Sequence, residues 1–269
     1  MLPDPMLPDI YTRTLADNRR ALAAWSIGTA AVGLMYAAFY PQVGGGGGLA
    51  ETVQNYPEAM REALRMQDIG SAAGYLGSTV FGLLLPLLVM AFGVTFGARA
   101  IAGDEETGYL DLLLAHPVGR TRLAVERFAG LVTGAAAIAI LVFAGMLAIR
   151  SGAELESIGI AELAAQCVHL ALLGITFGAL AVGLGAALGK RGPVLGISVG
   201  IGVLTYIAGN LAGVIGADWL KYLSPFHYYI GGEPLRNGMQ WADTAILLVV
   251  SAALVFLGFL RFNRRDLRS

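Results

Sequence analysis

The residue types that most often carry chemistry are scarce in this chain and lie far apart. The histidines are His116, His169 and His227, and the single cysteine is Cys167. The sequence contains neither the His-Glu-x-x-His pattern of zinc hydrolases nor the Gly-x-Ser-x-Gly turn that presents a serine nucleophile. A lone cysteine without spaced cysteine or histidine partners argues against a metal site. We therefore predict no catalytic residue and no metal ligand.

The nearest approach to a nucleotide-binding motif is GLGAALGKRG at residues 183–192. A phosphate-binding loop needs a glycine where Leu184 stands and a serine or threonine where Arg191 stands. The segment is better interpreted as the end of a helix rich in small residues. We therefore expect the chain to bind no cofactor of its own, so that any ATP and Mg²⁺ are bound by another subunit.

Three polar side chains interrupt apolar stretches, namely Gln166, His169 and Asn210. In hydrocarbon such groups should face protein or a water-filled cavity, which makes them candidates for lining a transport pathway. Gln166 and His169 also lie near one end of their predicted helix, where they could simply reach the membrane surface. Both interpretations stay open at this point.

The elements that would position these residues are membrane-spanning helices. Hydrophobic residues make up 56% of the 269 residues and charged residues only 14%, against about 25% charged in a soluble domain. A helix of about 20 apolar residues crosses the hydrocarbon core and satisfies its own backbone groups there. We therefore predict an all-α polytopic fold, with one membrane domain over residues 1–269. Its six spans are expected at 22–40, 75–98, 128–149, 163–188, 194–216 and 243–260.

The distribution of Lys and Arg predicts the orientation. With both termini and the loops after the second and fourth spans on one side, that side holds 13 of the 18 basic residues. The other side keeps Arg61, Arg65, Arg150, Lys221 and Arg236. The positive-inside rule then places both termini in the cytoplasm. The net charge of −1 gives no indication of nucleic-acid binding.

Local patterns add further expectations. Residues 9–21 alternate apolar and charged side chains at helical spacing, which predicts an amphipathic helix on the membrane surface or a polar lead-in to the first span. Pro86 should kink or loosen the second span. Glycines four residues apart, as at Gly93 and Gly97, permit close helix contacts. The aromatic segment 217–242 is either a re-entrant hairpin or an aromatic belt.

The most distinctive segment is the loop between the second and third spans. Three acidic residues, at positions 104–106, precede the clustered leucines Leu110, Leu113 and Leu114, and Pro117 then ends the helical pattern. A short helix with exposed leucines can insert into the groove of a partner protein, or it can lie on the lipid surface. The residues alone do not separate these two interpretations.

This loop resembles the cytoplasmic loop of the membrane subunits, or permeases, of type-2 ATP-binding-cassette transporters. The family pattern is approximately E-E-x-G-T-L-x-L-L-L-x-x-P-V-S-R. The residues that match it are Glu105, Glu106, Gly108, Leu110, Leu112, Leu113, Leu114, Pro117, Val118 and Arg120. Tyr109 and Gly119 replace the usual threonine and serine. The resemblance extends to the amphipathic start, the six spans and the Leu-Ser-Pro-Phe element at 223–226.

The resemblance implies that segment 104–120 is a coupling helix that contacts a separate cassette ATPase. The residues that it would assign to this contact are Glu105, Glu106, Gly108, Leu110, Leu113, Leu114, Pro117 and Arg120. It also implies pairing with a second copy or a related permease chain. The expected function is export of an apolar or amphipathic substrate, such as a drug, lipid or peptide, across the plasma membrane. The alternatives are a non-transporting anchor or sensor coupled to the ATPase, and a stand-alone channel or carrier.

Overall fold

The computed structural model describes residues 10–44, 49–66, 68–106, 108 and 119–264. Throughout the described chain the regular structure is helical, without strands. The elements before the third span are α1 (Ile10–Ala37), α2 (Tyr40–Gly44), α3 (Leu49–Gln54), α4 (Glu58–Ala63), α5 (Ala72–Tyr75), η1 (Leu76–Leu84), α6 (Leu85–Ala98), η2 (Arg99–Gly103) and α7 (Asp104–Glu106). Those that follow are α9 (Arg120–Ile149), α10 (Ile160–Leu188), α11 (Arg191–Leu211), η3 (Asp218–Leu223), α12 (Pro225–Ile230), α13 (Pro234–Asn237) and α14 (Trp241–Arg264).

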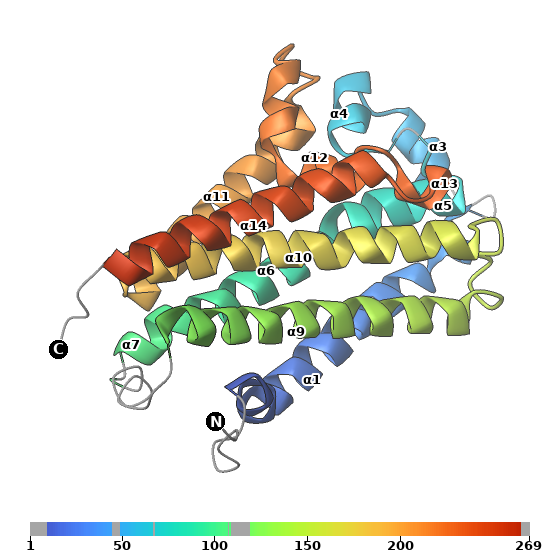
Figure 1. Ribbon diagram of the computed structural model, residues 1–269. Coiled ribbons are helices and arrows are strands. Elements are labelled where there is room, and N and C mark those ends of the chain that lie inside the picture. The colour runs from blue at the N-terminus through green and yellow to red at the C-terminus, as the bar shows by residue number, and fades with distance from the viewer. Residues whose placement is uncertain (1–9, 45–48, 67, 107, 109–118, 265–269) are drawn as a thin grey trace.

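Six stretches of the described chain are long and apolar enough to cross a membrane, which confirms the predicted fold class. They are Ile10–Val43, Ala72–Glu106, Thr121–Ile149, Ile160–Leu188, Arg191–Leu211 and Trp241–Phe262. The start of α1 and the end of α14 lie at the same end of the bundle, which we call the terminal end (Figure 1). The opposite end, which carries α3, α4, α5, α12 and α13, is the loop end.

The predicted amphipathic helix at 9–21 is not a separate element, because α1 is continuous from Ile10 to Ala37. Figure 1 shows its first turns, in dark blue, nearly end-on while the rest of α1 runs across the view, so the helix changes direction. These first turns pack on α9. The backbone N–H of Tyr11 donates to Glu126 at 3.0 Å, and the Tyr11 hydroxyl lies 2.9 Å from that of Thr133. A position on the membrane surface stays a prediction.

Glycines bring the second and fourth spans into backbone contact, as their spacing predicts. A Cβ atom placed on Gly93 of α6 would lie 2.2 Å from the carbonyl oxygen of Gly174 in α10. One placed on Gly97 would lie 2.6 Å from the carbonyl oxygen of Gly178. No real Cβ atom tolerates such distances, so only glycine allows α6 and α10 to approach this closely. This contact fixes the centre of the bundle.

The turns before Pro86 are widened into the π-helix η1, which confirms that this proline loosens the second span. Because proline has no N–H, the carbonyl groups one turn earlier lose their usual donor. Two tyrosines replace it. The hydroxyl of Tyr229 in α12 donates to the carbonyl of Phe81 at 2.9 Å, and that of Tyr206 in α11 donates to Gly82 at 3.0 Å.

The aromatic segment at the loop end has a buried part and an exposed part, while its predicted placement as a re-entrant hairpin or an aromatic belt stays a prediction. Phe226 and Tyr229 of α12 are buried within the bundle, whereas Trp219 and Trp241 are exposed. The turn into α12 is held by Ser224 of the Leu-Ser-Pro-Phe element. Its hydroxyl accepts from the N–H of Phe226 and donates to the carbonyl of Thr205 in α11 at 2.7 Å. Ser224 therefore anchors α12 to α11.

Candidate functional site

The structure describes part of the predicted coupling segment. Glu105 and Glu106 lie in α7, Gly108 follows it, and Arg120 is the first residue of α9. The predictions for Leu110, Leu113, Leu114 and Pro117 fall outside the described residues. Gly108 has a left-handed backbone with φ of 69°, and its N–H donates to the carbonyl of Glu105 at 3.1 Å. A glycine is therefore the suitable residue for this turn.

The acidic turn α7 is bonded to the third span. Asp104 forms an ion pair with Arg127 of α9, with 2.6 Å between Oδ2 and Nη2. The two side chains are only 19% and 12% exposed, so the pair is shielded from solvent and from salt. Reorientation of α7 would therefore displace α9. Sequence analysis did not predict this pair, which joins residues 23 positions apart.

The same turn is bonded to the fifth span. The Oε1 atom of Glu106 accepts a hydrogen bond from the backbone N–H of Arg191 at 2.9 Å. Arg191 is the first residue of α11, where N–H groups lack partners within the helix and the helix dipole favours a negative charge. Glu106 thus caps α11 from a distant part of the chain. Its predicted contact with an ATPase and this observed contact involve the same carboxylate.

A cavity of about 300 Å³ lies beside α7 at the terminal end. Its lining includes Asp17 and Asn18 of α1, Arg99 and Asp104 near the end of the second span, and Arg127 of α9. These residues come from three spans, so the cavity connects the turn α7 with the first turns of α1.

The three predicted pathway residues separate into two groups. Gln166 and Asn210 line a second cavity, of about 310 Å³, at the loop end. His169 is not part of its lining. The ring of His169 is buried, with Nδ1 3.2 Å from the carbonyl oxygen of Tyr229 and Nε2 2.9 Å from the Thr244 hydroxyl. These contacts join α12 to α10 and α14, so His169 has a structural role in the described chain.

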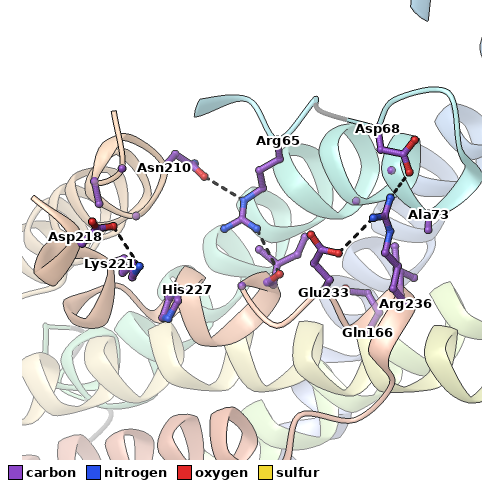
Figure 2. A pocket seen from close by; sticks show the side chains of 18 residues that line it. Arg65, Asp68, Ala73, Gln166, Asn210, Asp218, Lys221, His227, Glu233 and Arg236 are labelled. Carbon is purple, nitrogen blue, oxygen red and sulfur yellow. Dashed lines mark hydrogen bonds and ion pairs between the residues drawn. The ribbon is translucent and has the colours of Figure 1, made fainter. Parts of the chain in front are cut away.

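Arg65 is the central residue of the loop-end cavity, and sequence analysis did not assign it a role. Figure 2 shows its side chain reaching down between Asn210 and Glu233. Nε donates to Oδ1 of Asn210 at 3.4 Å and Nη1 to the carbonyl of Ile230 at 3.3 Å. Burial lowers the pKa of this guanidinium, while nearby Tyr206, Glu233 and Tyr229 oppose the shift. The one feature of the sequence that pointed to Arg65 is its position, because few basic residues lie on the side opposite the termini.

Backbone strain is concentrated at the same cavity. Only Arg65, Glu154 and Glu233 among the described non-glycine residues have a left-handed backbone, and two of them, Arg65 and Glu233, line it. Such conformations cost free energy and cluster at functional sites.

Comparison with known proteins identifies the family. Residues 10–267 match the family model described as ABC-2 family transporter protein. A search of curated proteins finds no match. The matched range covers every described span and both ends of the bundle. Because this family model matches almost the whole chain, including all six described spans, the chain belongs to the ABC-2 type transporter permease family.

Proposed function

We propose that the chain is the membrane subunit of an ATP-driven exporter and that a separate cassette ATPase moves it through segment 104–120. Membership of the ABC-2 permease family implies association with such an ATPase. The observation that carries the proposal is the double attachment of α7, through Asp104 to Arg127 in α9 and through Glu106 to the start of α11. A force applied to this turn would reach the third and fifth spans directly.

The nucleotide chemistry belongs to the partner in this proposal. ATP and Mg²⁺ bind the ATPase, and closure of the ATPase pair pushes on the coupling segment. Glu105 would meet basic groups of the partner, while Leu110, Leu113 and Leu114 would fill an apolar groove. The excess of basic residues at the terminal end supports a cytoplasmic position for that end in the plasma membrane, where an ATPase has access to it.

The surface of α11 supports pairing with a second permease. Gly192, Gly196 and Gly200 follow one another at intervals of four residues, and an added Cβ atom would meet nothing within 4 Å at any of them. The flanking Val199 and Val203 are exposed. Small residues on an open helix face allow another helix to approach closely within a membrane. A route for an apolar or amphipathic substrate would then run between the two copies.

Replacement of Leu113 and Leu114 by Asp tests the docking step. We expect the ATPase no longer to co-purify with the permease, because two charges cannot enter an apolar groove without a large desolvation cost. Leu188→Asp is the matched control, since Leu188 is an exposed leucine at the end of α10 on the same side of the bundle. Unchanged co-purification of the double variant would contradict the coupling assignment.

Transport in reconstituted vesicles separates this proposal from its two alternatives. Vesicles that contain the permease and its ATPase should move an amphipathic fluorescent dye only when ATP is present. ATPase binding without any transport would favour an anchor or sensor. Transport by the permease alone would favour a channel or carrier.

A further inference from the structure

The loop-end cavity contains a cation whose hydrogen bonds go to neutral atoms. Arg65 donates to an amide oxygen and a backbone carbonyl oxygen, at 3.4 and 3.3 Å, which is longer than the usual ~2.9 Å for such bonds. A guanidinium has further N–H groups in a planar fork that matches the oxygens of a phosphate or carboxylate. Arg65 is therefore suited to receive an anionic group from outside the chain.

The other charges of this cavity already pair with one another. Arg236 contacts both Asp68 and Glu233, and Lys221 lies 3.2 Å from Asp218. Glu233 also lies near Arg65 and favours its charged form. Among the described residues, however, no carboxylate forms an ion pair with Arg65. Figure 2 shows these pairs to either side of the Arg65 guanidinium.

A second group in the cavity lacks a partner. Gln166 of α10 is fully buried and lines the cavity, yet neither its Nε2 nor its Oε1 atom has a hydrogen-bond partner in the described structure. The Tyr229 hydroxyl lies close to the Gln166 amide and is the nearest group that Nε2 can approach. Because this hydroxyl donates its one proton to the carbonyl of Phe81, it leaves Oε1 of Gln166 without a donor. A buried amide without partners costs free energy that a bound polar ligand would recover. Gln166 therefore indicates that the cavity is built for a ligand.

Exposed aromatic residues at the loop end indicate which anion is available. Trp219 and Tyr222 of η3 are exposed beside Lys221, and Trp241 is exposed at the start of α14. Exposed tryptophan and tyrosine side chains at helix ends occupy the headgroup level of a bilayer. At this level the abundant anionic group is phosphate. We propose that the loop-end cavity binds a phosphate group through Arg65 and Gln166, at the level of the lipid headgroups.

This proposal does not depend on export, because binding is measurable on the purified chain without an ATPase. The test is native mass spectrometry of the detergent-solubilised protein, titrated separately with short-chain phosphatidylglycerol, glycerol phosphate and inorganic phosphate. We expect the wild-type protein to retain a phosphate-bearing ligand. Arg65→Gln should weaken that binding roughly 10-fold or more, because it removes a charge-assisted contact. Binding of phosphatidylglycerol alone would identify a lipid headgroup as the source, and binding of all three would identify phosphate itself.

Three further variants separate the contributions of charge, side-chain shape and the Gln166 amide to binding. Arg61→Gln removes the same charge from α4, outside the cavity lining, and should leave binding unchanged. Arg65→Lys keeps the charge but loses the planar fork, so partial binding is expected. Gln166→Met, which keeps the size of the side chain, should weaken binding about three-fold, even if the Arg65 variants fail to fold. Equal binding by the Arg65→Gln and Arg61→Gln proteins, or no binding of any phosphate compound, would overturn the proposal.

Discussion

The two ends of the bundle use charged residues in different ways. At the loop end, Arg65 and Gln166 lie in a cavity lined by residues of α10, α11 and α12. In the described chain Arg65 has only long hydrogen bonds to neutral atoms, and the Gln166 amide is not fully hydrogen-bonded. At the terminal end, Asp104 is paired with Arg127 and Glu106 accepts from the N–H of Arg191, so the two residues connect three spans. Unsatisfied buried groups suit the capture of a small ligand, whereas groups on a short turn that are bonded to other spans suit the transmission of force.

The second span connects these ends, and its geometry changes along its length. It is π-helical at Leu76–Leu84 near the loop end and at Arg99–Gly103 near the terminal end, with the α-helical α6 between them. π-Helical turns are less common than α-helical ones and often accompany functional sites. The α-helical middle is the part that packs against α10 through glycine. The second span therefore has an α-helical centre held against α10 and π-helical turns at both ends.

The largest effect is expected at that centre. Gly93→Leu would place side-chain atoms where the backbone of α10 now lies, because even a Cβ atom would be 2.2 Å from the carbonyl oxygen of Gly174. We expect a loss of about 3 kcal/mol in the free energy of unfolding, typical of severe overpacking. Gly28→Leu is the control, since nothing lies within 4 Å of its added Cβ. Unfolding by denaturing detergent measures both, and equal stability would show that α6 and α10 can separate without cost.

A smaller effect is expected at the loop end of the second span. Tyr229→Phe removes the donor to the carbonyl of Phe81 and leaves that carbonyl buried without a partner. The expected cost is about 1–3 kcal/mol, from the same unfolding measurement. Tyr228→Phe is the neighbouring control, because the Tyr228 hydroxyl bonds to Tyr222 at the exposed surface. A Tyr229→Phe protein as stable as this control would show that water or another group can replace the tyrosine.

The features that depend on the composition of one segment were predictable from the sequence. The six spans follow from long apolar runs, the π-helical turns before Pro86 follow from that proline, and the paired glycines indicated close helix contacts without specifying which helices meet. In each case the physical cause lies within a few neighbouring residues. The sequence left open whether residues 9–21 form a separate helix or lead into the first span, because no helix-breaking residue separates them and hydropathy alone marks the boundary.

The contacts between distant segments were not predictable. Glu106 meets a residue 85 positions away, and Arg65 meets Asn210 across 145 positions. Such contacts depend on how the spans pack, which a single sequence does not specify. Among the pathway candidates, Gln166 and Asn210 line the loop-end cavity and His169 joins three helices, while a role in a transport pathway stays a prediction for all three.

The ion pairs of the two ends should differ in how much stability they contribute, and the pair at the loop end should show the smallest effect. Asp104→Asn weakens a pair whose side chains are 19% and 12% exposed, whereas Asp68→Asn weakens its pair with Arg236, where they are 52% and 40% exposed. We expect about 2 kcal/mol of destabilisation for Asp104→Asn, because Arg127 stays shielded without its counter-charge. For Asp68→Asn the expected loss is below about 1 kcal/mol, and added salt should reduce it further. Equal and equally salt-sensitive losses would mean that the terminal-end pair is solvated like a surface pair, and α7 would then be attached to α9 too weakly to transmit force.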